Sequence, residues 1–166
     1  MKRKGIHFIW ILLLITRFSF AAEWSSLRGP TGMGIYSEKL SVSWQSGDVE
    51  WTKEIEGKGQ SSIVQAGSKI FVTSAKKNNV RFLYCLNKER GELLWKKEIN
   101  NKRTESIHRM NGWATPTPAT EGNRVVAFFG PAGLQCFDLE GNKQWSLDLG
   151  EFPSHWGVAA SPIIHN

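Results

Sequence analysis

Two histidines, His108 and His155, are the side chains of this 166-residue sequence best suited to hold a metal or a ligand. Each is followed by a tryptophan, Trp113 or Trp156, and Arg109 adjoins the first of them. Together these five residues form a candidate surface for a ligand or a protein partner. The alternative, which we favour on the sequence, is that they are loop residues that pack and cap. Two histidines without further ligands do not make a zinc site, so we predict no metal centre.

The common catalytic motifs are absent from the sequence. Cys-x-x-Cys, His-Glu-x-x-His and Gly-x-Ser-x-Gly do not occur. The glycine-rich stretch at 24–34 lacks the Gly-Lys-Ser or Gly-Lys-Thr of a phosphate-binding loop, so we expect an irregular lead-in over 22–47. We therefore predict no catalytic residue. Whether the histidines can act together depends on the elements that position them.

An internal repeat organises the chain. Residues 81–99 have the apolar alternation of two short strands joined by a tight turn, and residues 134–149 repeat the pattern. In each copy a turn glycine, free to adopt positive φ, precedes a tryptophan by four residues. The matching positions are Cys85 and Cys136, Asn87 and Asp138, Gly91 and Gly141, and Trp95 and Trp145.

Extended to the flanking segments, the repeat predicts units of four antiparallel strands. The first unit spans 61–99, with strands at 61–65, 69–74, 81–87 and 92–99. The second spans 114–149, with strands at 114–120, 125–129, 133–138 and 142–149. An isolated outer strand with Trp51 at its centre is expected at 48–55, and the start of a third unit at 158–166.

Four short strands per repeat of about 44–50 residues are typical of a β-propeller blade. One such sheet cannot bury both of its faces, so it must stack on its neighbours. The recurring tryptophan suits this contact because it offers a broad apolar surface and an N–H that can reach the next blade. The predicted fold is therefore all-β, with about two propeller blades, and both histidines lie in connections between successive units.

The element at 85–95 resembles the tryptophan-docking motif of pyrroloquinoline-quinone-like (PQQ-like) propeller repeats, which runs roughly Ala-x-Asp-x-x-Thr-Gly-x-x-x-Trp. Gly91 and Trp95 match this motif, and the second copy keeps its Asp, Gly and Trp but is one residue shorter. Three positions of the first copy depart from it: Cys85, Asn87 and Arg90. The lead-in, with Arg28-Gly29-Pro30, is also similar to the opening of exported bacterial proteins of this superfamily.

The resemblance implies a ring of seven or eight blades. On that basis we expect the sequence to be the front part of a longer protein, whose missing C-terminal blades would be partners of the two present here. The outer strand at 48–55 would then complete the last blade. The alternative is a short chain that closes a ring by oligomerising.

The first 21 residues have the pattern of a secretory signal. A basic start, an apolar stretch over 6–15 and small residues before position 22 fit a cleaved leader, and the apolar stretch is too short to span a bilayer. Four of the 21 basic residues lie in this segment, which leaves 17 against 15 acidic residues and lowers the net charge from +6 to +2. We therefore expect export to the periplasm or beyond and no binding to nucleic acid.

The two cysteines of an exported chain would ordinarily suggest a disulfide. Cys85 and Cys136 occupy equivalent positions of neighbouring repeats, however, and side chains so placed point the same way from separate sheets. We predict two buried thiols that pack as small apolar groups.

Three functions are compatible with these patterns, and the fold alone does not choose among them. The one we favour is a non-catalytic binding or scaffold propeller of the bacterial cell envelope, without a cofactor. The resemblance also allows a PQQ-dependent (quinoprotein) dehydrogenase, which would bind PQQ with Ca²⁺. A third possibility is a role like that of the outer-membrane protein assembly lipoprotein, although no lipid-attachment cysteine follows the signal.

Overall fold

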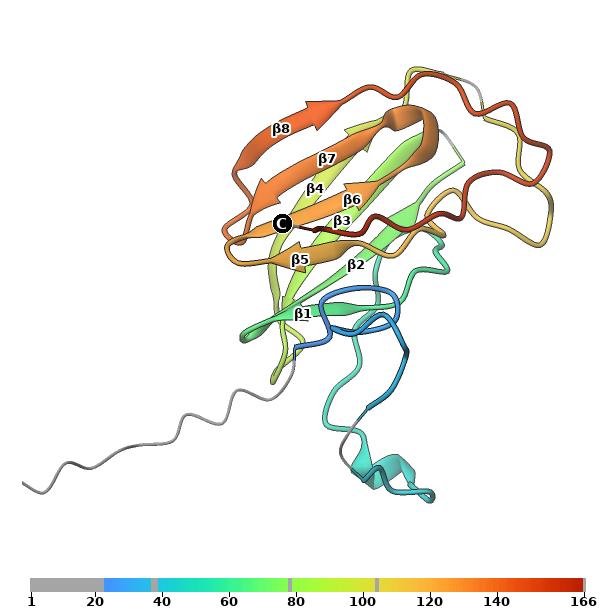
Figure 1. Ribbon diagram of the computed structural model, residues 1–166. Coiled ribbons are helices and arrows are strands. Elements are labelled where there is room, and N and C mark those ends of the chain that lie inside the picture. The colour runs from blue at the N-terminus through green and yellow to red at the C-terminus, as the bar shows by residue number, and fades with distance from the viewer. Residues whose placement is uncertain (1–22, 37–38, 78, 104, 166) are drawn as a thin grey trace, which may run out of the picture.

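The computed structural model describes residues 23–36, 39–77, 79–103 and 105–165, so the predicted signal at 1–21 lies outside the described part. Two four-stranded antiparallel sheets lie one over the other (Figure 1). Within the described ranges, no helix is long and apolar enough to cross a membrane. The predicted all-β fold with four-stranded blades is confirmed.

Each sheet is a simple meander in chain order. The first contains β1 (Val64–Ala66), β2 (Lys69–Ala75), β3 (Val80–Asn87) and β4 (Leu93–Asn100). The second contains β5 (Ala119–Glu121), β6 (Arg124–Phe128), β7 (Leu134–Asp138) and β8 (Lys143–Leu147). Two short 3₁₀ turns, η1 (Ser46–Asp48) and η2 (Gly130–Ala132), complete the regular structure of the described residues.

The main hydrophobic core lies between the two sheets. Its members alternate along the strands, as expected where one face of each sheet is buried against a neighbour. The first sheet contributes residues such as Phe71 and Leu83, and the second contributes Val125 and Phe137. Both cysteines are free and buried, as predicted. Burial raises the pKa of the Cys85 thiol to about 12, so this thiol is protonated at neutral pH.

Equivalent turns connect the third and fourth strands of the two sheets. Asn87 Oδ1 accepts the backbone N–H groups of Glu89 and Arg90 at 3.0 and 2.9 Å. Asp138 Oδ1 accepts those of Glu140 and Asn142 at 3.0 and 2.7 Å. The amide at position 87, which departs from the docking motif, therefore closes its turn in the same way as the carboxylate does.

Each turn receives the tryptophan of the preceding repeat. Trp51 Nε1 donates to the carbonyl oxygen of Lys88 at 2.9 Å, and Trp95 Nε1 donates to that of Leu139 at 2.9 Å. The indole rings lie against Gly91 and Gly141, which have φ of 65° and 87° and no room for a Cβ atom. The predicted contact between successive repeats is thus observed twice.

The predicted strand at 48–55 is not formed. Residues 46–48 make η1, and 49–55 run without strand pairing across the outer face of the first sheet. There Ile55 packs on Val80, Phe82 and Tyr84, and Glu56 N–H donates to the Tyr84 hydroxyl at 3.1 Å. The segment has the side chains of a strand, but among the described residues no neighbouring strand lies beside it to complete a ladder.

The predicted strand at the start of the third unit is also absent, since 158–165 have no strand pairing. The first strand of each blade is shorter than expected for a different reason. Pro116 and Pro118 cannot donate to a ladder, which delays β5 to Ala119. Before β1, Gln60 N–H donates to the Ala114 carbonyl and Ser62 N–H to the Thr117 hydroxyl, so these groups bond to the second repeat instead.

The lead-in joins the two sheets at their inner strands. Gln65 N–H donates to the carbonyl of Trp24 at 2.9 Å, and Thr120 N–H donates to that of Ser25 at 2.8 Å. Two successive residues of the lead-in therefore serve one strand of each sheet, β1 and β5. This contact fixes the relative position of the blades at the edge opposite β4 and β8.

Candidate functional site

The candidate site is formed by the two connections between repeats. Residues 101–113 follow β4 and residues 150–157 follow β8, and the two segments run close together at one end of the sheets (Figure 1). We call the surface that they present, with the adjoining residues 57–58 and 75–77, the connection face. All five predicted site residues contribute to its packing or its cavities in different ways, and His155 lines a different cavity from Arg109 and Trp113.

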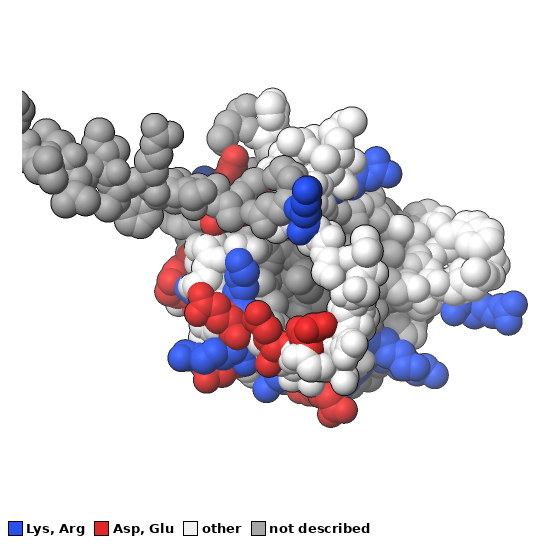
Figure 2. All heavy atoms as spheres, turned by 90° about the horizontal axis from the view of Figure 1, so that it is seen from below, with Lys and Arg blue, Asp and Glu red and all other residues white. Residues whose placement is uncertain are grey.

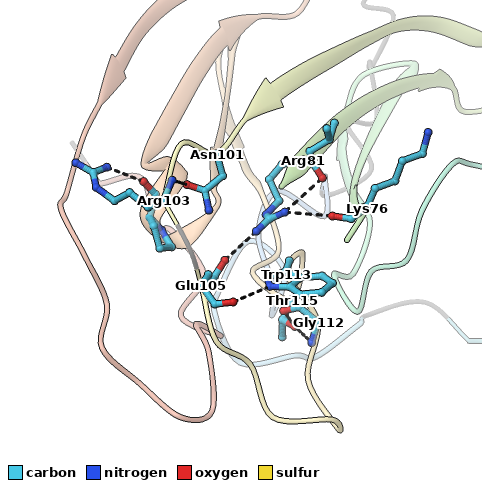
Figure 3. Close-up of polar contacts among 10 residues, drawn as sticks. Lys76, Arg81, Asn101, Arg103, Glu105, Gly112, Trp113 and Thr115 are labelled. Atoms are coloured by element: carbon cyan, nitrogen blue, oxygen red, sulfur yellow. Dashed lines mark hydrogen bonds and ion pairs between the residues drawn. The ribbon is translucent and has the colours of Figure 1, made fainter. Parts of the chain in front are cut away.

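A buried ion pair anchors the first connection to the first sheet. Arg81 of β3 donates from its Nη2 to Glu105 Oε2 at 2.9 Å, and the two side chains are only 0% and 4% exposed (Figure 3). The remaining Arg81 contacts are long, at 3.4 Å to the Val80 carbonyl and 3.5 Å to the Lys76 carbonyl. Burial lowers the pKa of Arg81 and raises that of Glu105, while the mutual hydrogen bond opposes both changes.

Trp113 covers this ion pair. The Arg81 guanidinium lies 5.5 Å from the centre of the indole, and Trp113 Nε1 donates to the Glu105 backbone carbonyl at 3.5 Å. A buried pair of this kind costs about 3–5 kcal/mol when one partner is removed, because the other charge is then stranded. Trp113, predicted as a candidate ligand contact, therefore has a structural role in holding the connection against β3.

A second ion pair ties the same connection to Asp148, the residue that follows β8. Arg103 binds Asp148 with two nitrogens, at 2.9 and 2.7 Å, and also donates to the Pro131 carbonyl at 3.0 Å. The backbone N–H of Arg103 donates to Asn101 Oδ1 at 3.0 Å. Since the connection is held to both sheets, its path is fixed by side chains although it contains no strand.

The two connections contact each other through two predicted residues. The rings of His108 and Trp156 lie 4.5 Å apart, and Asn111 Nδ2 donates to the Trp156 carbonyl at 2.6 Å. Gly157, at φ 77°, leaves room for the Ile107 side chain. Trp156 nevertheless remains 65% exposed and Met110 74% exposed, so the joined connections present large apolar side chains to solvent.

His155 is not part of this contact. It is exposed and lines a separate cavity with residues that include Glu105, Ser106 and Phe152. The two predicted histidines therefore face different neighbours. No group of three or more His, Cys, Asp or Glu side chains that could hold a metal ion occurs among the described residues.

A cavity of about 510 Å³ lies beneath the connection face, between residues 57–58, the end of β2 and the first connection. Arg109 and Trp113 line it, as do three lysines that the sequence analysis did not select: Lys58, Lys76 and Lys77. The only feature of the sequence that pointed to these lysines was the Lys76-Lys77 doublet in a turn. Nothing local in the sequence indicated that Lys58 would join it, because the two segments meet only through the pairing of Lys58 with Ala75.

Charge elsewhere is mixed. Figure 2, seen from below, shows acidic and basic side chains interspersed on that face. Glu56 contacts both Lys76 and Lys96, which lower its pKa to about 2. The face seen in Figure 2 therefore carries both signs of charge and has no broad patch of one sign.

Two described carboxylates, Glu105 and Asp138, do not fit a quinone and Ca²⁺ site, because both are already engaged within the fold. Glu105 is held by Arg81 and nearly fully buried, and Asp138 accepts the hydrogen bonds that close its turn. A Ca²⁺ site takes six to eight oxygen ligands, several of them carboxylates.

A comparison with known protein families agrees with this architecture. A PQQ-repeat family model described as outer membrane protein assembly factor BamB matches residues 39–166, which include both sheets and the connection face. Among solved structures, a europium-containing methanol dehydrogenase is similar at 21% sequence identity and a TM-score of 0.40. That match covers 52% of this chain and 15% of the dehydrogenase, so the chain spans a small part of that protein's length. No curated protein matches the chain in sequence.

Proposed function

This chain belongs to the family described as outer membrane protein assembly factor BamB, and we propose that it is a non-catalytic binding or scaffold propeller of the bacterial cell envelope. The family match bears out the predicted PQQ-like repeats. Envelope proteins are what the family description suggests, and the leader-like pattern at 1–21 supports export to the periplasm or beyond.

The observation that carries the proposal is the joining of two consecutive connections into one surface. Ion pairs fix the first connection to both sheets, and the His108–Trp156 contact fixes the second connection to the first. Exposed aromatic and sulfur-containing side chains on a preordered surface are typical of protein interfaces. Trp156 and Met110 are such residues, and neither is used by the packing of the sheets.

The family description favours one specific form of this role, participation in the assembly of outer-membrane proteins. In that form the connection face would contact another envelope protein of the assembly machinery. We place it second because the description belongs to the family and names no residue of this chain.

The test is co-purification with envelope proteins from a strain that produces the tagged full-length protein at its natural level. We expect defined partners to be retained by the wild type and lost from a Trp156→Ala/Met110→Ser variant. A matched control, Leu40→Ala/Val42→Ser, changes exposed apolar residues outside the connection face and should retain them.

A quinone assay tests the enzymatic alternative on the same preparation. Full-length protein incubated with PQQ and Ca²⁺ is expected to show no quinone-like absorbance and no dye-linked oxidation of alcohols. Either signal, lost in a heat-unfolded control, would overturn the proposed non-catalytic role.

A further inference from the structure

We propose that the cavity beneath the connection face binds an acidic peptide segment that carries an aromatic or aliphatic side chain. This inference rests on the proposed binding role and names the class of partner. It is drawn from three features of the cavity, namely its apolar floor, its unpaired cations and the rigidity of its walls.

The floor of the cavity is apolar. Trp113, Ile107 and Ala75 contribute to it, and its volume of about 510 Å³ is within the range of roughly 300–1,000 Å³ in which proteins bind ligands. The Trp113 ring is held from behind by the buried Arg81 and through the Glu105 carbonyl. A side chain the size of Phe or Leu would therefore meet a surface that is already in place.

The rim of the cavity is basic. Lys58, Lys77 and Arg109 are exposed on three different segments, and none of them has an ion-pair partner among the described residues. Lys76, which also lines the cavity, is engaged by Glu56. No Asp or Glu is among the described lining residues. Three free cations around an apolar floor are complementary to carboxylates placed on either side of an apolar side chain.

The walls are fixed by backbone contacts. Lys58 N–H donates to the Ala75 carbonyl at 2.9 Å, and Ala75 N–H donates to the Lys58 carbonyl at 2.8 Å. Gly57, at φ 82°, leaves no space for a Cβ atom beside the Ala75 carbonyl. Lys58 is therefore presented from an ordered backbone, so little conformational entropy is lost on this side of the cavity when a ligand binds.

A second cavity, beside the second blade, does not share this character. It lies between the first connection, the turn after β6 and the second connection, and it is lined by both signs of charge, including Lys102, Arg103, Glu105 and Glu151. Arg103 is already bound to Asp148. The basic rim is thus specific to the first blade and is not a by-product of the repeat.

A peptide explains the geometry better than a membrane surface does. Lipid headgroups would require a broad basic face, whereas the free cations here encircle one concave apolar site. An extended acidic peptide can place one apolar side chain on Trp113 and its flanking carboxylates near Lys77 and Arg109.

The experiment measures fluorescence anisotropy of a labelled peptide, Glu-Asp-Phe-Glu-Asp, with the full-length protein. We expect saturable binding that weakens with added salt. Replacing the peptide's Phe by Ser should weaken binding at least about fivefold. The variant Lys77→Glu/Arg109→Glu should weaken it at least about tenfold.

The matched control is Lys88→Glu/Lys143→Glu, which makes the same change of charge at exposed lysines away from the cavity. It should bind within about twofold of wild type once the ionic strength is set near 0.15 M, where distant charges are screened. Circular dichroism of both variants checks that each remains folded.

Equal binding by the cavity variant and the control would overturn the inference, as would equal binding of the Phe and Ser peptides. Sedimentation with vesicles of anionic lipid, if abolished by the cavity variant while the peptide fails to bind, would also overturn it in favour of a membrane surface. None of these results touches the proposed non-catalytic role, whose own failure would be seen as quinone-dependent oxidation.

Discussion

Trp95 and Trp145 occupy the same position of two successive blades and have different surroundings. Both lie directly across the strand pair from a cysteine, Cys85 or Cys136. Trp95 is packed against Phe71 and Phe137 and is hydrogen-bonded to Leu139 of the next sheet. Trp145 is 43% exposed, and its Nε1 has no acceptor among the described residues. The strand register thus places both indoles opposite a cysteine. Burial of the indole requires in addition that the next sheet packs against it.

Truncation of the two indoles should give the largest difference in the free energy of unfolding. Trp95→Ala should lower the free energy of unfolding by about 3–5 kcal/mol, because it opens a cavity between the sheets. It also removes one of the two donors to the Leu139 carbonyl, the other being Lys69 Nζ. Trp145→Ala should cost less than about 1 kcal/mol, since much of that side chain is already in solvent.

Urea unfolding of the two variants, followed by far-ultraviolet circular dichroism, measures this difference. Equal losses in the free energy of unfolding would mean that both tryptophans are docked in solution, and that the Trp145 ring is buried there. That outcome would remove the contrast between the blades.

An intermediate effect is expected at the turn glycines. Gly141→Ala places a Cβ atom 2.9 Å from the Trp95 ring at a φ of 87°, and we expect a loss of about 2–3 kcal/mol in the free energy of unfolding. Gly122 is the matched control. It also has positive φ, at 58°, but no atom lies within 4 Å of an added Cβ, so Gly122→Ala should cost about 1 kcal/mol.

The difference between the two glycine variants isolates the docking contact from backbone strain. It should shrink in a Trp95→Ala background, where the ring is gone. If the Gly141 variant were no less stable than the Gly122 variant, the indole would not rest on this turn.

The smallest effect concerns the residue that closes each turn. At pH 7, Asp138→Asn should lower the free energy of unfolding less than Trp95→Ala or Gly141→Ala does. The reason is that the amide of Asn87 already makes the equivalent contacts in the first turn. Hydrogen bonds, first of all that from the Asn142 side chain, lower the pKa of Asp138. A carboxyl group with a lowered pKa stabilises the fold above its unfolded value of about 3.9, and this contribution is lost as pH falls through the folded pKa.

Melting temperatures recorded between pH 2 and pH 7 test this expectation. The wild type should lose stability more steeply than Asp138→Asn below about pH 4. Parallel curves for the two proteins would show that the carboxylate and the amide are interchangeable in this turn at every pH.

Residue spacing predicted the repeat contacts well. A glycine and a tryptophan four residues apart, after a residue that can cap a turn, define a local geometry that requires little from the rest of the chain. Gly91, Gly141 and Trp95 accordingly have the positions expected of them. The strand at 48–55 was mispredicted because strand formation also needs a pairing partner, and apolar alternation does not say whether one is present.

The candidate site was less predictable because it depends on where separate loops meet. His108 contacts Trp156, but His155 lines a different cavity. Ion pairs of Glu105 and Arg103 fix the path of the first connection, and the His108–Trp156 contact joins the second connection to it. Arg81, an arginine within an apolar strand, gave no sign of its buried partner 24 residues away. Lys58, Lys77 and Arg109 are scattered in the sequence and share one rim only after the first sheet has formed.

The hydrogen bonds of the Trp51 and Trp95 indoles each join one repeat to the next repeat only. Cohesion of this kind passes from neighbour to neighbour, as in other modular chains whose stability is close to a sum of unit and interface contributions. A change in the loops of one module therefore leaves the docking of modules that it does not touch unaltered. The blades become free to diverge at their loops, as the cavities of these two blades have already done in charge.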